Sequence, residues 1–213
     1  MTRNLLLMSV LIITVSCITG EGAKTTHDKG KGITVNAIKN PDNTITSFFY
    51  NEGKEIAQQV RDRDGAIIKA TGTIPDGIVR EYYESGKLKE VSNYKNNKRE
   101  GTSKWYYEDG VLRAERPYKD DKLNGIVKWH YTTGSLGTEF NYQNGTLEGL
   151  TRLYWENGNL KAEDYYKDGK RDGIKTLYYN SGQLRFVYTY KNGKKINLKT
   201  YSKSGALMSD ENY

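Results

Sequence analysis

The chain has 213 residues, of which 36% are hydrophobic, and this low apolar share excludes a large globular core. Its 18 Tyr and 22 Gly, with only 3 Pro, exclude a wholly disordered chain and indicate strands joined by tight turns. The formal net charge of +7 is mixed with acidic residues along the chain rather than gathered in a patch, which argues against nucleic-acid binding.

The first sixteen residues have the features of an export signal. Arg3 supplies a positive charge, and residues 5–15 form an apolar run that is too short for a bilayer, which needs about 20 apolar residues. The T-V-S-C step at 14–17 resembles the lipobox of bacterial lipoproteins, in which a small residue precedes the acylated cysteine, although Thr14 departs from the usual Leu, Val or Ile. The resemblance implies cleavage after residue 16, attachment of palmitate and other acyl chains to Cys17, and an exported protein anchored in a membrane of the cell envelope.

The alternative is an ordinary signal peptide cut near Gly20 or Gly22. Cys17 is the single cysteine of the chain, so no intrachain disulfide can form. Loss of Arg3 with the signal takes the net charge from +7 to +6.

Two further segments precede the regular part of the chain. Residues 17–44 are polar, contain glycines and lysines, and show no periodicity, so they predict a flexible linker behind the lipidated cysteine. Residues 45–76 contain aromatic residues before Gly53 and a turn at Asp64-Gly65, without the spacing found later. This segment predicts a degenerate N-terminal cap made of strands.

Residues 77–213 contain a 24-residue repeat in about five and a half copies. One glycine series comprises Gly77, Gly101, Gly125, Gly149 and Gly173, and a second comprises Gly86, Gly110, Gly134, Gly158 and Gly182. A leucine series (Leu88, Leu112, Leu136, Leu160, Leu184) and a tyrosine series (Tyr94, Tyr118, Tyr142, Tyr166, Tyr190) keep the same phase. We number the units 1 to 5 from residues 77, 101, 125, 149 and 173. A sixth, incomplete unit follows, in which one residue is deleted; terminal repeats are often atypical in this way.

Each unit predicts a β-hairpin. In unit 4, residues 150–155 form an aromatic-rich strand, Asn157-Gly158 is a turn, residues 160–166 form the return strand, and residues 167–170 turn into the next unit. Because side chains alternate across a strand, one face is predicted to be packed, with Trp105, Trp129 and Leu153 beside the leucine series. The other face is predicted to carry a basic–aromatic stripe, our candidate binding site. Its residues are Arg80, Tyr82, Lys104, Tyr106, Lys128, His130, Arg152, Tyr154 and Tyr178.

The unit G-x-x-x-x-Y-Y-x-x-G-x-L-x-x-x-x-x-Y-x-x-G-K-x-x-G resembles the bacterial variant of the MORN repeat. His130 departs from the pattern at the first aromatic position, and Asn97 and Asp121 stand where the late turn has glycine. The resemblance implies an all-β fold, an elongated single-layer antiparallel sheet of tandem hairpins that leaves no enclosed cavity. It also implies a scaffold that binds a protein or anionic lipids, and some bacterial members are labelled antitoxin components.

Two alternatives remain open at this level, and no catalytic site is predicted. The step W-Y-Y-E-D-G at 105–110 is similar to that of choline-binding wall anchors, which would make the chain a glycan-binding module. MORN repeats also accompany phosphoinositide kinases, but kinase motifs are lacking here. His27 and His130 are far apart and Cys17 is committed to lipid, so we expect neither an enzyme nor a metal or cofactor.

Overall fold

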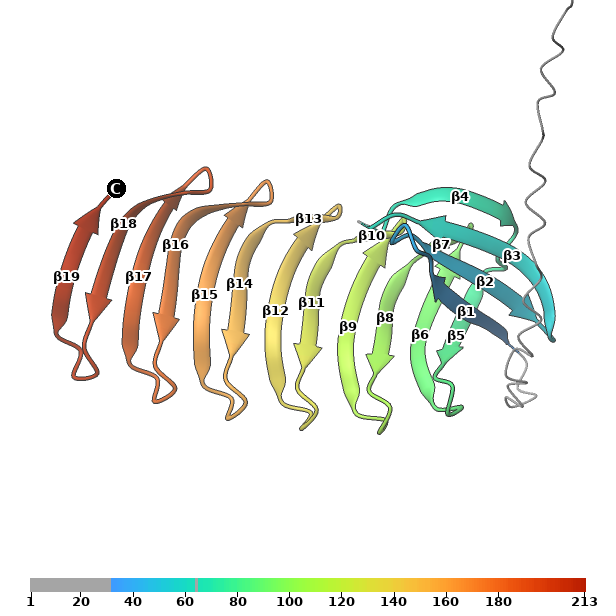
Figure 1. The fold of residues 1–213 in the computed structure, drawn as a ribbon, viewed down its shortest axis with the longest axis horizontal. Coiled ribbons are helices and arrows are strands. Elements are labelled where there is room, and N and C mark those ends of the chain that lie inside the picture. Colours follow the sequence, from blue (N-terminus) through green and yellow to red (C-terminus); the bar gives the residue numbers. More distant parts are fainter. Residues whose placement is uncertain (1–31, 64) are drawn as a thin grey trace, which may run out of the picture.

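The computed structural model describes residues 32–63 and 65–213, and all of its regular structure is β-sheet (Figure 1). The predicted signal peptide, the lipidated Cys17, His27 and the linker up to residue 31 lie outside the described residues. The remaining chain forms one open sheet of 19 strands, most of them antiparallel, which confirms the predicted array of tandem hairpins.

The strands follow one another along the chain with short connections. They are β1 (Ile33–Lys39), β2 (Ile45–Asn51), β3 (Lys54–Arg61), β4 (Ile67–Gly72), β5 (Gly77–Tyr82), β6 (Leu88–Lys95), β7 (Lys98–Arg99), β8 (Gly101–Tyr106), β9 (Leu112–Lys119), β10 (Lys122–Leu123), β11 (Gly125–His130), β12 (Leu136–Gln143), β13 (Thr146–Leu147), β14 (Gly149–Tyr154), β15 (Leu160–Lys167), β16 (Lys170–Tyr178), β17 (Leu184–Lys191), β18 (Lys194–Tyr201) and β19 (Leu207–Asn212). The sixth, incomplete unit supplies the end of β18 and all of β19, as the repeat predicted.

The early turn of each unit is a three-residue loop that ends in glycine. In unit 4 the Trp155 amide donates to the Asn159 carbonyl (2.8 Å), and the Gly158 amide donates to the Trp155 carbonyl (2.8 Å). Gly158 has φ of 87°, a left-handed conformation that glycine adopts without steric cost. The predicted hairpin turn is confirmed at this position.

The late turn between units is a two-residue turn of type I′, which has positive φ at both central residues. Asp168 and Gly169 have φ of 49° and 74°, and Asn, Asp and Gly tolerate this region best. The Gly169 amide also donates to the carbonyl of Leu147 in the preceding unit (3.0 Å), and the late turns of units 2, 3 and 5 make the equivalent bond. Asn97 and Asp121, which depart from the repeat, keep the same left-handed backbone with φ of 64° and 66°.

A register shift beside every early turn corrects the predicted placement of the leucine series. In unit 1, Glu81 pairs with Glu90, but the next pair is Tyr82 with Leu88, so the return strand contains one extra residue, Lys89. Such a bulge changes which face a side chain occupies. The leucines therefore share a face with Tyr82 and its equivalents, not with Trp105.

Strands β1–β4 form an N-terminal cap, and β1 shows that the predicted linker is too long. Residues 33–39 are a strand because Ile33, Val35 and Ala37 alternate with other residues, a period that the linker prediction overlooked. β1 pairs with β2 in an antiparallel register and with β5 in a parallel one, in which Ile33 lies opposite Val79. The cap is thereby joined edge to edge to unit 1.

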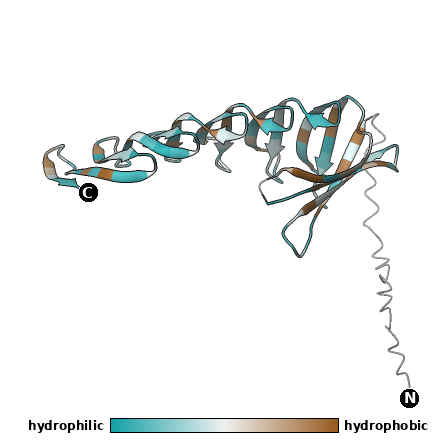
Figure 2. Cartoon of the chain, turned by 90° about the horizontal axis from the view of Figure 1, so that it is seen from above, coloured by the Kyte–Doolittle hydropathy of each residue, from teal (hydrophilic) through white to brown (hydrophobic). Residues whose placement is uncertain are grey.

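The cap turns back over the first units, so the sheet is a single layer only beyond them (Figure 2). The main apolar cluster lies in this fold and contains Phe49, Ile74, Val79 and Tyr94, with the Phe49 and Tyr94 rings edge to face at 5.5 Å. Ala162 is the one buried hydrophobic residue found beyond unit 3 in residues 32–63 and 65–213. Burial therefore declines along the array as the cap ends.

Candidate binding surface

The pairing register assigns every repeat side chain to one of two faces. We call the face covered by the cap the inner face. On the described strands it includes Val79, Glu90, Ser92, Tyr94, Ser103, Trp105, Ala114, Arg116, Tyr118, Val127, Trp129, Phe140, Tyr142, Asp164, Phe186, Tyr188 and Tyr190. The opposite face, the outer face, carries the predicted basic–aromatic stripe.

The stripe residues share the outer face, but they are not uniformly basic. Lys104 and Lys128 both pair with Glu115, and Glu139 lies between Lys128 and Arg152. Arg152 binds Glu163 (Nε to Oε1, 3.0 Å), so at this end the charges are compensated within the sheet. Glutamates on the return strands thus divide the row of cations that the first strands suggested. A binding role for the stripe stays a prediction.

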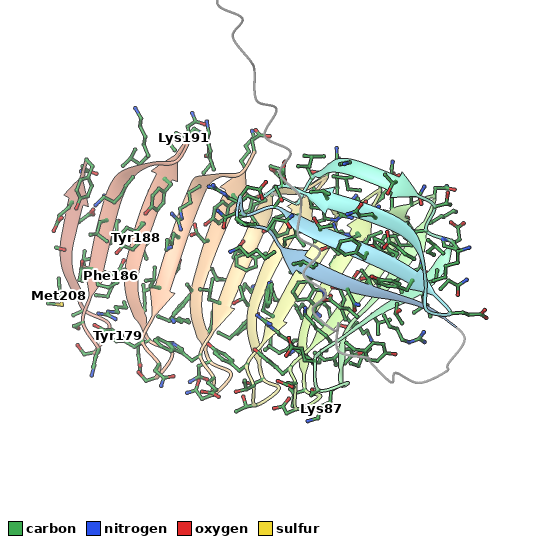
Figure 3. The ribbon with its side chains drawn as sticks, turned by 45° about the vertical axis from the view of Figure 1, so that its right-hand side comes forward. Lys87, Tyr179, Phe186, Tyr188, Lys191 and Met208 are labelled. Carbon is green, nitrogen blue, oxygen red and sulfur yellow. The ribbon has the colours of Figure 1, made fainter. Side chains whose placement is uncertain are left out.

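Aromatic residues at the early turns tie one unit to the next. The hydroxyls of Tyr83, Tyr107 and Tyr131 donate to the carbonyls of Tyr106, His130 and Tyr154 at 2.7, 2.7 and 2.8 Å. Tyr179 repeats the bond to the Tyr201 carbonyl at 3.2 Å. In unit 4 the residue is Trp155, whose buried Nε1 has no acceptor in the described part of the chain. These aromatic residues therefore have a structural role along the early-turn edge of the sheet. Tyr179 lies at this edge, and Lys191 lies at the opposite, late-turn edge (Figure 3).

The two departures from glycine in the late turns are the places where the cap is held. Asp121 accepts hydrogen bonds from Arg61 of the cap (Nη2, 3.0 Å) and from Arg99 (Nε, 2.7 Å), and all three side chains are at most 15% exposed. Asn97 accepts the Ile74 amide on its side-chain oxygen (2.6 Å). The sequence showed that both residues depart from the repeat, but it did not indicate that they bind the cap.

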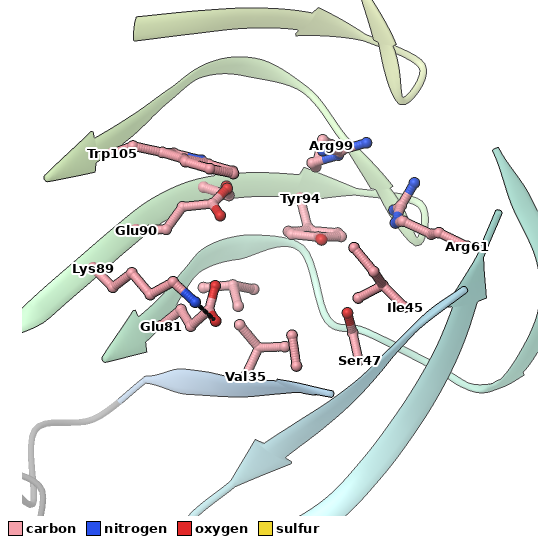
Figure 4. Close-up of a pocket in the computed structure, with 13 residues that line it drawn as sticks. Val35, Ile45, Ser47, Arg61, Glu81, Lys89, Glu90, Tyr94, Arg99 and Trp105 are labelled. Carbon is pink, nitrogen blue, oxygen red and sulfur yellow. Dashed lines mark hydrogen bonds and ion pairs between the residues drawn. The ribbon is translucent and has the colours of Figure 1, made fainter. Parts of the chain in front are cut away.

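A cleft of about 230 Å³ lies between the cap and units 1 and 2 (Figure 4). The cap and β5 contribute most of its apolar side chains together with Ser47, Arg61 and Glu81, whereas the opposite wall carries mainly charged and aromatic side chains. Val35, Ile45, Glu90, Tyr94 and Trp105 line the cleft. The predicted slab without a hollow does not account for this cleft, because the fold-back of the cap was not foreseen.

Burial controls the protonation of groups around the cleft. It raises the pKa of Tyr94 to about 12, and it also raises the pKa of Tyr118 above its ordinary value. Burial likewise raises the pKa of Glu81, although Lys89 opposes this effect through an ion pair of 2.6 Å. Both tyrosines are therefore neutral hydrogen-bond donors at physiological pH.

Beyond the cap, the inner face presents rows of half-buried aromatic side chains. Phe140 and Tyr142 have ring centroids 6.4 Å apart, and Phe186, Tyr188 and Tyr190 follow one another at 6.0 and 6.2 Å. Phe186 and Tyr188 lie along β17 near the C-terminal end of the array (Figure 3). No described strand covers these rings.

The hairpins are similar to a known family of repeats. Four of the units match the family model of the MORN repeat variant. The matched segments are residues 75–96, 99–120, 147–168 and 171–192. Unit 3 lies between them and forms the same hairpin from β11 and β12, although it contains His130 and is outside the matched segments. No curated protein sequence matches the chain.

Among residues 32–63 and 65–213, no group of three or more His, Cys, Asp or Glu is arranged to hold a metal ion. In the same part of the chain, no helix is long and apolar enough to cross a membrane.

Proposed function

We propose that this chain is a non-enzymatic scaffold of the cell envelope, tethered through a lipid on Cys17, that holds a protein partner against its inner face. The observation that carries the proposal is the uncovered row of aromatic side chains beyond the cap. MORN-type repeats agree with a scaffold, and the inner face offers the aromatic, extended surface that protein interfaces favour.

The outer face supports this choice by contrast. Its Lys, Arg and Glu side chains alternate across the strands, which is the pattern of a solvated sheet surface stabilised by cross-strand pairs of roughly 0.2–1 kcal/mol each. We therefore assign partner binding to the inner face and a stabilising role to the predicted stripe.

Photocrosslinking from each face tests the proposal in cells that naturally make the protein. A photoreactive amino acid at Tyr142 lies on the inner face, and one at Tyr165, which is 48% exposed, lies on the outer face of the next hairpin. We expect a defined protein adduct from Tyr142 and none from Tyr165. Equal adducts from both positions, or none from Tyr142, would refute the assignment.

The tether is tested separately. Cells are labelled with a radioactive fatty acid, and the wild-type chain is compared with Cys17→Ala. The proposal expects label and membrane association in the wild type only. Label that persists in C17A would refute lipidation at this residue.

A second candidate function, contact with anionic lipids, is favoured by the late-turn edge. Exposed lysines there face each other in four cross-strand pairs, Lys95 with Lys98, Lys119 with Lys122, Lys167 with Lys170 and Lys191 with Lys194. Like charges placed opposite each other are destabilising, so such pairs suit an anionic surface. Acidic neighbours weaken this edge, as in the ion pair between Lys98 and Asp120 (3.3 Å). Sedimentation with phosphatidylglycerol vesicles tests it, and binding should fall as salt rises.

A wall-glycan module and an antitoxin-type neutralising protein compete with the scaffold as functions for this chain. Retention on purified peptidoglycan with no protein adduct would favour the former. Measurable turnover of a phosphate donor by the pure protein would contradict a non-enzymatic scaffold.

A further inference from the structure

Units 2 and 3 differ from the rest of the array at one inner-face position. Trp105 and Trp129 stand where the other complete units have Glu81, Leu153 and Leu177. Both tryptophans pair with the same residue, Ala114, which is fully buried between them. Because alanine is small, the two indole rings meet edge to face across it, with centroids 6.3 Å apart.

Two arginines of β9 lie over these indoles. The Arg116 guanidinium is 4.7 Å from the centroid of the Trp105 ring and 5.6 Å from that of Tyr118. The Arg113 guanidinium is 5.6 Å from the centroid of the Trp129 ring and 5.5 Å from that of Tyr107. Stacking on aromatic rings fixes the position of a guanidinium without neutralising it.

Neither arginine is compensated by an acid. Within residues 32–63 and 65–213, the Arg113 and Arg116 side chains form no ion pair and no hydrogen bond, and neither does Arg185, which is stacked on Tyr179 and Phe186. Arg61, Arg99, Arg152 and Arg171, by contrast, bind carboxylates. Two positive charges without an ion-pair partner among the described residues therefore lie over the neighbouring indole rings, on the second strand of unit 2.

The same cluster is rich in hydrogen-bond donors that lack acceptors. Arg116 Nε, Trp105 Nε1 and the Tyr118 hydroxyl are buried and have no partner among the described residues. Tyr118 is only 5% exposed. Buried polar groups are paired in about 90% or more of cases, so three unpaired donors in one cluster are exceptional. The local chemistry calls for a negatively charged acceptor.

We propose that Trp105, Trp129, Arg113 and Arg116 form the seat for a carboxylate side chain in an extended acidic segment of a protein partner. This inference rests on the proposed function, which it deepens by naming the kind of segment that the inner face takes. Fixed guanidinium groups bind carboxylates in a bidentate geometry, and Arg and Trp are the residues that most often dominate protein interfaces.

The adjoining cleft explains why the partner is a peptide segment and not a free anion. Trp105 forms part of the cleft wall as well as the arginine cluster, so the two sites are continuous. A volume of about 230 Å³, flanked by Val35 and Ile45, suits one or two apolar side chains; drug-sized ligands occupy about 300–1,000 Å³. A segment with an apolar residue close to an acidic one would fill both sites.

The test uses the full chain and a display library of random octapeptides. We expect selected peptides to carry Asp or Glu at one fixed position, with an apolar residue nearby. A consensus peptide should bind at least about tenfold more weakly to R113Q or R116Q, since each variant loses a charge-assisted hydrogen bond to the peptide carboxylate. R116K, which keeps the charge but loses the bidentate geometry, should fall between R116Q and the wild type.

Lys104→Gln is the matched control, because it removes one positive charge from the residue before Trp105 on the outer face. It should leave peptide binding unchanged, and hydrogen exchange of the cap should show that R113Q and R116Q remain folded. The inference is overturned by a library that shows no acidic position, by equal binding to R116Q, or by equal competition from inorganic phosphate or phosphatidylglycerol vesicles. If the inner face still crosslinks a protein while R116Q binds it normally, the proposed function stands and only the seat is wrong.

Discussion

Replacing Asp121 by glycine would test how the cap is held on the array. Asp121 receives hydrogen bonds from Arg61 at 3.0 Å and from Arg99 at 2.7 Å, at 11–15% side-chain exposure. Removing one partner of a buried ion pair costs about 3–5 kcal/mol, because the remaining charges stay buried. Glycine is the residue at this position in the late turns of units 3 to 5, and it adopts the φ of 66° without strain. Relief of that strain offsets the loss by about 1 kcal/mol. We expect D121G to lower the free energy of cap opening by about 2–4 kcal/mol.

Hydrogen exchange of the β2 and β3 amides is the appropriate assay, because repeat arrays open locally and not as one cooperative unit. A loss of this size accelerates exchange in the cap by about thirtyfold to a thousandfold. Amides of β14–β18 should keep their rates, since no cap residue reaches them.

The neighbouring substitution Asp120→Gly provides the control in the same turn. Asp120 also has a positive φ (50°), but its ion pair with Lys98 is exposed, so its removal should cost less than about 1 kcal/mol. Equal cap exchange in D121G and D120G would refute the reasoning. In the double variant R61Q/D121G the loss of cap stability should be smaller than the sum of the losses in the two single variants, since both substitutions remove the same contact.

Three further predictions concern stability. The pKa of Tyr94 is about 12 in the folded chain and 10.0 when the side chain is free, so the unfolded chain loses this proton first as the pH rises. The free energy of unfolding, measured by urea denaturation, should therefore fall between pH 10 and 12. In Y94F the fall should be smaller. Y131F should destabilise the array by about 1–2 kcal/mol, because the Tyr154 carbonyl in the next unit loses its hydrogen bond. W155Y should supply the hydroxyl that unit 4 lacks and stabilise the array by up to about 1 kcal/mol. A lower melting temperature for W155Y would contradict this. A Cβ at Gly72 would lie 2.1 Å from a backbone oxygen, so G72A should cost well over the roughly 1 kcal/mol expected for G158A, where the space is open.

The candidate site was only partly predictable. The alternation of side chains correctly grouped the stripe residues on one face and Trp105 with Trp129 on the other. The sequence did not show that glutamates of the return strands separate the stripe cations, because that requires the register between strands. The bulge at Lys89 moved the leucine series to the outer face, and nothing in the local pattern specified the extra residue.

The sequence by itself determined the number of hairpins, their phase and both kinds of turn, since these depend on local backbone preferences of Gly, Asn and Asp that recur every 24 residues. Only the tertiary structure decided that β1 belongs to the sheet, that the cap folds back over units 1 and 2, and that a cleft results. Those features depend on contacts between distant residues, such as Arg61 with Asp121, 60 positions apart. No repeat or local propensity encodes such a pairing, although Asn97 and Asp121 had already broken the pattern at the places where the cap is held.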